Sequence, residues 1–435
     1  MRESRNPFWV PVGLALALLT ACAGGGAGKD GGDKPSGTPT AGGSSAARPS
    51  DPPVPVYDPP VKFDAAARDI VGGTGQGAWT VRLDGTTAYA VSDGEVRAVG
   101  VLDGKPLWSV KPQGRPGRSD GDGSLPTPRP SIVQLDGRRV LLAAFAVVRP
   151  GSGTAPERAV VELTAVAADS GERLWTTTLD RPEGQRDGDS LALVGAEPAT
   201  AVVRMGDDSD AVTLGIDLAT RETAWTAKGF IAEFVDRGTV VGRSGANGEA
   251  AGGRGIEGYR LSDGTKAWTY ASGLVEATLR PVGGGLFTAR KDPVGGEETE
   301  AVVASSTGRP PAGLDTDEQR ELSTVSGLTC LYDERATIVC SGTKGLDRRV
   351  FALDARTFEQ LWTIDESGGD RLVPEISTAW HGAVYGGTDN GPVVLDARTG
   401  KDKSTAPGVT PVQVNQYVGL SLTSPGTIEA HRATG

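Results

Sequence analysis

The sequence predicts an all-β protein in which short antiparallel sheets form a closed ring. Gly and Pro account for 63 and 29 of the 435 residues, whereas a typical globular chain carries roughly 12% of the two together. These residues punctuate turns, so their excess favours many short strands over helices. A phrase that recurs about every 47 residues beyond residue 60 has the period of a propeller blade, roughly 40–50 residues. These observations predict a β-propeller of eight blades, or alternatively seven, with four antiparallel strands in each blade.

Residues 1–21 are interpreted as a lipoprotein signal peptide. Two arginines precede an apolar run from Phe8 to Leu19, which is too short for a mature membrane helix of roughly 20 residues. The run ends in Leu-Thr-Ala-Cys at residues 19–22, which resembles the bacterial lipobox. In that motif the cysteine receives a lipid and becomes the new N-terminus, so Cys22 is the predicted lipidation site. An ordinary secretory signal with an incidental cysteine is the alternative.

Residues 22–60 are predicted to be the lipidated Cys22 followed by a disordered tether rich in Gly, Pro, Ser and Ala. Residues 23–56 contain no aromatic side chain, and such a segment cannot bury enough apolar area to fold. As a flexible chain it would span about 30–35 Å. A composition rich in Ala, Gly, Arg and Val is typical of a high-GC genome, for which an actinomycete is one source, and a monoderm bacterium of that kind has no outer membrane. We therefore expect an exported protein anchored to the lipid bilayer at the outer face of the plasma membrane, with residues 61–435 forming the propeller.

The recurring phrase is an apolar strand, a turn with Asp and Gly, and a Trp four residues after the Gly. It is clearest at residues 351–362 and 392–401. The Asp side chain can cap N–H groups of the turn, Gly accepts a left-handed backbone, and Trp offers a broad surface for sealing one blade against the next. The predicted turn residues are Asp217, Asp354, Asp396, Gly104, Gly171, Gly264, Gly308 and Gly400, and the predicted packing residues are Trp108, Trp175, Trp225, Trp268 and Trp362. Arg221 and Phe358 fill two further Gly positions, Ala312 fills one Trp position, and Gly435 is the last equivalent of the Gly.

This phrase resembles the repeat of the pyrroloquinoline-quinone (PQQ)-like β-propellers, A-x-D-x-x-T-G-x-x-x-W, over about residues 60–435. That family includes quinoprotein dehydrogenases and also non-enzymatic propellers, such as the lipoprotein subunit of the outer-membrane β-barrel assembly machinery. The resemblance implies an eight-bladed ring. Because the chain ends before the outer strand of its last blade, a segment around Val61–Asp64 is expected to supply that strand and close the ring.

Cys330 and Cys340 flank a stretch that is typical of a strand, a polar turn and a second strand. In an exported protein this pair favours a structural disulfide over redox chemistry, and closing so short a loop contributes roughly 2.5–3 kcal/mol. Quinoprotein dehydrogenases place a disulfide between adjacent cysteines beside the cofactor, and this chain has no adjacent pair. We therefore expect no cofactor, and PQQ in particular is not expected.

The charge balance and the rarity of His and Cys exclude further classes of partner. The chain has 44 Lys and Arg against 55 Asp and Glu, a net charge of −11, with two His and three Cys. Nucleic acid is not an expected partner, because its binding needs clustered Lys and Arg. A His/Cys metal site is not expected either. The acidic clusters at residues 120–123, 187–189 and 207–210 lack the spacing of a calcium loop and are interpreted as solvated turns.

Three candidates for catalysis carry little support in the sequence. Ser119 lies in a Gly-x-Ser-x-Gly match, but within a Gly/Pro-rich loop rather than a strand-to-helix elbow. His381 and His431 lie in strand-like segments with no partnered nucleophile. The glycine-rich run at residues 72–77 misses the dinucleotide spacing. No catalytic residue is therefore assigned, and an enzymatic role is left uncertain.

The sequence favours a monomeric, non-catalytic scaffold that binds an unidentified extracytoplasmic protein. Residues 111–130 are one candidate partner loop, with a disordered insertion as the alternative. The rival hypothesis is a PQQ-dependent or other small-molecule-binding enzyme or sensor with its site in the central channel.

Overall fold

The computed structural model describes most of the chain after the predicted tether. The described residues are 54–72, 79–117, 130–181, 190–206, 210–244, 254–293, 295–314, 316–424 and 426–435. The predicted signal peptide, Cys22, Ser119, the acidic segments 120–123 and 187–189 and residues 207–209 of the third acidic segment lie outside the described residues, as does the middle of the loop 111–130. Val54–Gly435 form one compact unit. No helix among the described residues is long and apolar enough to cross a membrane.

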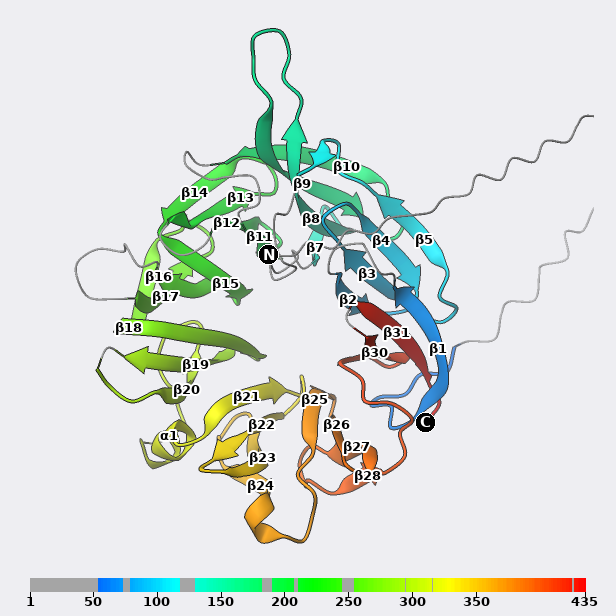
Figure 1. The fold of residues 1–435 in the computed structure, drawn as a ribbon, viewed down its shortest axis with the longest axis vertical. Coiled ribbons are helices and arrows are strands. Elements are labelled where there is room, and N and C mark those ends of the chain that lie inside the picture. Colours follow the sequence, from blue (N-terminus) through cyan, green and yellow to red (C-terminus); the bar gives the residue numbers. More distant parts are fainter. Residues whose placement is uncertain are drawn as a thin grey trace, which may run out of the picture. The chain divides into compact units, whose positions relative to one another are not determined.

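The described chain forms seven antiparallel sheets that follow one another around a ring in chain order (Figure 1). Sheet 1 contains β2 (Thr80–Asp84), β3 (Thr87–Val91), β4 (Val96–Gly100) and β5 (Pro106–Val110). Sheet 2 contains β6 (Arg115–Pro116), β7 (Ser131–Leu135), β8 (Arg138–Arg149), β9 (Arg158–Ala167) and β10 (Arg173–Asp180). Sheet 3 contains β11 (Leu191–Glu197), β12 (Thr200–Met205), β13 (Val212–Asp217) and β14 (Thr223–Lys228).

The second half of the ring begins with a larger sheet. Sheet 4 contains β15 (Phe230–Asp236), β16 (Thr239–Ser244), β17 (Arg254–Arg260), β18 (Lys266–Gly283), β19 (Leu286–Pro293) and β20 (Thr299–Ala304), and α1 (Thr316–Ser323) follows it. Sheet 5 contains β21 (Ser326–Tyr332), β22 (Thr337–Lys344), β23 (Asp347–Asp354) and β24 (Gln360–Asp365), followed by the short 3₁₀ helix η2 (Glu366–Gly368). Sheet 6 contains β25 (Glu375–Trp380), β26 (Ala383–Thr388), β27 (Gly391–Asp396) and β28 (Asp402–Ser404). Sheet 7 contains β29 (Gln413–Val414), β30 (Val418–Ser424), β31 (Thr427–Ala433) and β1 (Phe63–Val71).

Sheet 7 closes the ring with strands from both ends of the propeller. β1 pairs antiparallel with β31, and Phe63 lies opposite Ala433. The prediction that an N-terminal strand completes the last blade is therefore confirmed. β31 would otherwise be the open outer edge of sheet 7, and β1 covers this edge, so that the two ends of the propeller are held in one sheet.

The ring has seven sheets, which agrees with the alternative prediction of seven blades. The repeat turns in the sequence predict eight units. The reason for the difference is β18, which spans 18 residues. Its first half pairs with β17 and its second half pairs with β19. One strand is thus the last strand of one repeat unit and the first strand of the next, and the two units merge into the single six-stranded sheet 4.

The ring has two faces, which we name by the turns they carry. The turns between the third and fourth strands lie beside those between the first and second strands, because Leu218 N–H donates to the Ala199 carbonyl (2.9 Å) and Ala397 N–H to the Gly382 carbonyl (3.1 Å). We call this the turn face. The hairpins between second and third strands emerge at the opposite end of each sheet, which we call the hairpin face.

The apolar core lies in the seams between neighbouring sheets. One cluster joins sheets 2 and 3, from Val133 to Leu218, and another joins sheets 5 and 6, from Val339 to Ala397. Strands that pack on both sides are buried along their whole length: β12 is buried at all six positions, Thr200 and Arg204 included. The core is therefore distributed around the ring, and each seam between two sheets has its own set of buried apolar side chains.

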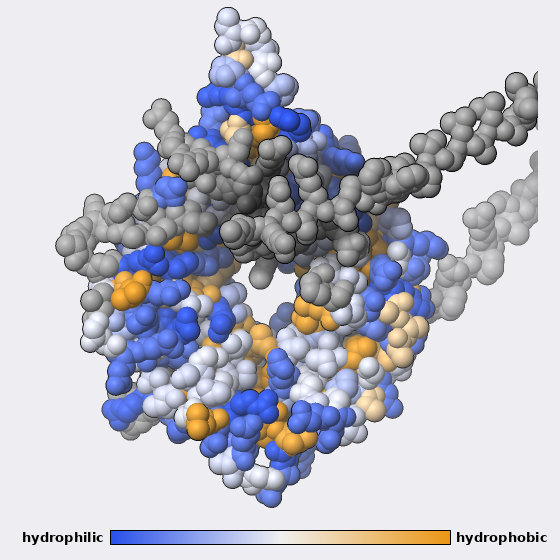
Figure 2. Space-filling model, in the orientation of Figure 1, coloured by the Kyte–Doolittle hydropathy of each residue, from blue (hydrophilic) through white to orange (hydrophobic). Residues whose placement is uncertain are grey.

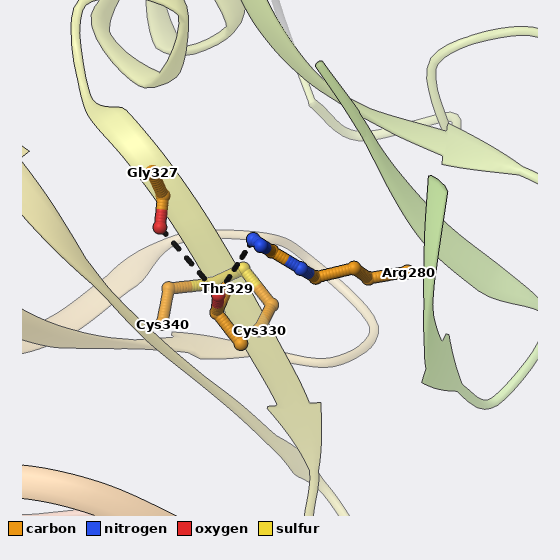
Figure 3. The surroundings of a disulfide bond; sticks show 5 residues. All are labelled: Arg280, Gly327, Thr329, Cys330 and Cys340. Atoms are coloured by element: carbon orange, nitrogen blue, oxygen red, sulfur yellow. Dashed lines mark hydrogen bonds between the residues drawn. A yellow bond between two sulfur atoms is a disulfide. The ribbon is translucent and has the colours of Figure 1, made fainter. Parts of the chain in front are cut away.

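The predicted disulfide is present in sheet 5. Cys330 of β21 lies directly opposite Cys340 of β22, and their sulfur atoms are bonded. Both side chains are buried. Figure 3 shows the bond between two neighbouring strands, so the prediction of a disulfide across this hairpin is confirmed.

Candidate functional site

The seven described repeat turns share one backbone geometry. In each turn the N–H at the Gly position donates to the carbonyl four residues earlier, at 2.7–2.9 Å. The residue at this position has a φ between 61° and 74°. Arg221 and Phe358 adopt this left-handed conformation as well, although it costs an L-residue roughly 1–2 kcal/mol.

The turn aspartates accept hydrogen bonds from the backbone of the same turn. Asp217 Oδ1 accepts from the N–H groups of Ala219 (2.9 Å) and Thr220 (2.7 Å). Asp354 Oδ1 accepts from Arg356 and Thr357, and Asp396 makes the equivalent bonds in sheet 6. The N–H of Thr220 is the main reason why the pKa of Asp217 is lowered, and that of Arg356 lowers the pKa of Asp354. These carboxylates are thus engaged in holding the turns.

Four of the repeat tryptophans bridge one repeat unit to the next. The indole N–H donates to the carbonyl three residues before the next Gly position, at 2.8–3.0 Å; the pairs are Trp108–Ala168, Trp225–Leu261, Trp268–Ser305 and Trp362–Ala397. Each indole also covers the glycine of that next turn. A Cβ atom on Gly264 would lie 2.5 Å from the Trp225 ring. Glycine is needed at this turn for close approach as well as for its positive φ.

Two units depart from the pattern in complementary ways. The repeat turn that follows the Trp175 unit carries Arg221 instead of Gly. The Arg221 guanidinium lies over the Trp175 ring, 5.7 Å from its centroid. Ala312 stands where a Trp is expected, and the next turn carries Phe358, which is buried. The sequence contained this signal for Phe358 alone, since only its turn follows a unit that lacks Trp.

Phe358 belongs to an apolar seam covered by α1. Leu314, Leu322 and Phe358 line a cavity of about 40 Å³ together with residues of β23. The second unit of sheet 4 ends at β20 without a fourth strand. α1 follows at that place and buries Leu322 against the seam, which the sequence reading did not foresee.

A polar cluster lies between sheets 4 and 5. Figure 2 shows an opening through the ring. Arg280 Nη1 of β18 donates to Thr329 Oγ1 of β21 at 3.1 Å, beside the disulfide (Figure 3). Glu300 of β20 is buried, and its Oε1 has no hydrogen-bond partner. Burial raises the pKa of Glu300, although the N–H of Leu328 opposes the shift.

The residues around the disulfide do not fit a PQQ site of the dehydrogenase kind. Such a site places a disulfide of adjacent cysteines against the cofactor. Here the two cysteines are ten positions apart and buried within an apolar cluster. The described residues contain no group of three or more His, Cys, Asp and Glu that could hold a metal ion.

Both histidines are engaged in contacts that hold the fold. His431 is buried in sheet 7, where Nε2 lies 2.9 Å from Ser421 Oγ and Nδ1 lies 3.0 Å from the Asp64 carbonyl oxygen. His381 lies in the turn between β25 and β26 with a φ of 47°, and not in a strand as its sequence context suggested. Its Nδ1 lies 2.5 Å from Asp58 Oδ1.

The hairpin face carries four exposed large apolar side chains. Leu346 and Leu372 lie between strands, and Val275 and Leu422 lie within β18 and β30 near this end of the sheets. Leu346, at the tip between β22 and β23, is 96% exposed. Leu372 lies between two clefts of about 350 and 390 Å³ that the segment from Asp370 to Leu372 separates. Of the seven exposed large apolar side chains among the described residues, these four lie at this face, whereas Val54, Val56 and Leu107 lie elsewhere. An exposed apolar patch is a candidate interaction surface.

A closed ring of seven antiparallel sheets, five of them four-stranded, with repeat turns packed against tryptophan rings defines the protein as a β-propeller. Its domain is a PQQ-like β-propeller: the family model described as "PQQ_2: Outer membrane protein assembly factor BamB" matches residues 70–270. No curated protein matches the chain.

The fold is similar to those of solved structures, two of which have low sequence identity to this chain. One is titled "Dihydro-heme d1 dehydrogenase NirN in complex with DHE", with 15% identity, a TM-score of 0.44, and coverage of 84% of this chain and 67% of the other. The second is Sqt1 of Saccharomyces cerevisiae, with 9% identity, a TM-score of 0.47, and coverage of 87% of this chain and 100% of the other.

Proposed function

We propose that the protein is a membrane-anchored extracytoplasmic lipoprotein whose propeller is a non-catalytic scaffold that binds another protein through its hairpin face. The observation that carries this proposal is the set of apolar side chains Leu346, Leu372, Leu422 and Val275, exposed on one face. The lipobox-like segment ending in Cys22 supports the anchoring. The matching family model, named after an assembly factor, supports a scaffold role.

The chemistry of the repeat supports the same proposal. Its Trp, Asp and Gly residues are used in the seams and turns, as with Trp225, Asp217 and Gly264. The repeats therefore build a rigid ring, and the loop residues between the repeats are available to recognise a partner protein. We expect a monomer with no bound cofactor and no nucleic-acid partner.

Site-specific crosslinking in cells tests the scaffold proposal. A photoreactive residue replaces Leu346 or Leu372 on the hairpin face, and a matched control replaces Lys401, which is exposed on the turn face. The hairpin-face positions should yield one discrete adduct that mass spectrometry identifies, and Lys401 should not yield it. Equal adducts from both faces, or none from either, would contradict a docking surface on the hairpin face.

A small-molecule site in the channel is the second candidate, because Glu300 has an unpartnered buried oxygen beside the Arg280 cluster. The test adds PQQ and Ca²⁺ to the purified protein and measures quinone absorbance and dye-linked alcohol or sugar oxidation. A gain of both would overturn the non-catalytic proposal. The absence of both, together with a specific crosslink from Leu346, would support it.

A further inference from the structure

The chain enters the propeller along a defined path across the turn face. We call residues 54–62 the strap. The Tyr57 N–H donates to the Gln416 carbonyl at 3.0 Å, in the turn between β29 and β30. The Pro60 carbonyl accepts from the buried Tyr385 hydroxyl at 2.8 Å. Val61 N–H then donates to the Gly435 carbonyl at 2.6 Å, and β1 begins two residues later.

A charged cluster fastens the strap at its centre. One oxygen of Asp58 lies 2.5 Å from His381 Nδ1, and the other accepts from Arg335 Nη2 at 2.6 Å. Arg335 Nη1 also donates to the His381 carbonyl at 3.3 Å. The His381 ring stacks on Trp380, with centroids 3.9 Å apart and planes inclined by 12°. Bonds to both carboxylate oxygens fix the direction of the side chain as well as its position.

The groups that hold the strap come from three sheets but from one kind of turn. Arg335 lies between β21 and β22, His381 between β25 and β26, and Gln416 between β29 and β30. These are the turns between first and second strands, and all belong to the turn face. The strap therefore runs along the inner turns of sheets 5, 6 and 7 before the chain reaches the start of β1.

We infer that the strap orients the propeller on the membrane, with the turn face toward the lipid surface and the hairpin face away from it. The inference rests on the proposed lipid anchor at Cys22. Only the residues between Cys22 and Val54 separate the lipid from a strap that is fixed to the turn face. A chain attached at the turn face keeps that face, averaged over the positions of the flexible tether, nearer to its anchor than the opposite face. The two faces are separated by the eight residues of β23, about 25 Å at 3.3 Å per residue.

The orientation has a consequence for the binding scaffold. The exposed apolar residues Leu346 and Leu372 lie on the hairpin face and would point away from the membrane. The partner that fits this arrangement is an extracytoplasmic protein or domain that stands beyond the propeller, with the propeller between it and the bilayer. A partner buried in the membrane beneath the turn face does not fit.

Energy transfer between the ring and the bilayer tests the orientation. The full-length lipidated protein is placed in liposomes that contain an acceptor-labelled lipid, and a donor dye is attached at Leu346→Cys or at Lys401→Cys. The native cysteines do not compete for the dye, since Cys330 and Cys340 are bonded and Cys22 would carry the lipid. Transfer is expected to be about twofold higher or more from Lys401→Cys, given the separation of about 25 Å between the faces.

The combined variant Asp58→Ala with Arg335→Ala should remove the orientation. The ratio of transfer between the two labels is then expected to approach one. Hydrogen exchange at the Tyr57 N–H should accelerate, because its bond to Gln416 depends on the fixed strap. The matched control is Arg348→Ala with Glu366→Ala, which removes another exposed ion pair (2.7 Å) at the hairpin face and should leave both readouts unchanged.

The outcomes separate this inference from the proposed function. Equal transfer from both labels in the unmodified strap, with the protein bound to liposomes, would overturn the orientation alone. No transfer from either label, because the protein does not bind liposomes, would overturn the lipid anchor and the inference together. An unchanged ratio in Asp58→Ala with Arg335→Ala would refute the role of the strap.

Discussion

Gly264→Ala tests whether the repeat glycines serve close packing or only backbone conformation. Gly264 has a φ of 66°, and an added Cβ would lie 2.5 Å from Cδ2 of Trp225. The left-handed conformation costs roughly 1–2 kcal/mol. Forcing the Trp225 ring away adds an overpacking cost of roughly 1–3 kcal/mol. The free energy of unfolding should therefore fall by about 2–5 kcal/mol in total.

Gly85→Ala is the matched control for this prediction. Gly85 has a φ of 56°, and an added Cβ would meet no atom within 4 Å. Its cost should be the conformational part alone, about 1–2 kcal/mol. Urea unfolding of both variants, followed by tryptophan fluorescence, measures the difference in free energy at constant m value.

A double-mutant cycle with Trp225→Ala isolates the steric part. Removing the indole should make Gly264→Ala as mild as Gly85→Ala, because only the backbone cost then remains. Equal destabilisation by Gly264→Ala and Gly85→Ala in the unmodified background would refute the close-packing argument. So would a cycle that shows no coupling between Trp225 and Gly264.

Three further predictions concern other parts of the ring. The double variant Cys330→Ser with Cys340→Ser should lower the free energy of unfolding by about 2.5–3 kcal/mol, and its urea midpoint should no longer respond to a reductant, unlike that of the native protein. Asp354 has a lowered pKa, so its carboxylate stabilises the fold above about pH 4 and this contribution is lost as the pH falls further. Asp354→Asn should be less stable at pH 7 and decline less steeply below pH 4, and parallel pH profiles would contradict this. Phe358→Gly should destabilise the protein by about 2–4 kcal/mol because it opens a cavity. Arg221→Gly should be neutral or stabilising by up to about 1 kcal/mol because it relieves a positive φ. Thermal unfolding of the two variants shows whether the melting temperature falls in the first and is unchanged or rises in the second.

The repeat could be located from the sequence because its residues act within short distances along the chain. The turn at Gly400, the cap by Asp396 and the strand that precedes them are all set by neighbouring residues. The disulfide between Cys330 and Cys340 closes a single hairpin and was predictable for the same reason. Closure by β1 followed from counting strands, since the last unit lacked its outer strand.

Contacts between distant segments could not be predicted in this way. Asp58 and His381 are 323 positions apart, and neither belongs to the repeat. α1 replaces a strand where Ala312 breaks the motif, which only the packing of the seam reveals. The merging of two units in β18 depends on the strand continuing through Gly273, at a φ of 72°, where the repeat pattern predicts a break between units.

The pairing of β1 with β31 sets the order in which the protein can be completed. Phe63 meets Ala433, which is synthesised 370 positions later, so β1 cannot pair until β31 has been made. Until then β1 is an unpaired strand, and contacts between such distant positions form slowly. We expect the final step of folding to be the capture of this strand, and a chain truncated before β31 would keep a permanently open edge for proteases and neighbouring chains to exploit.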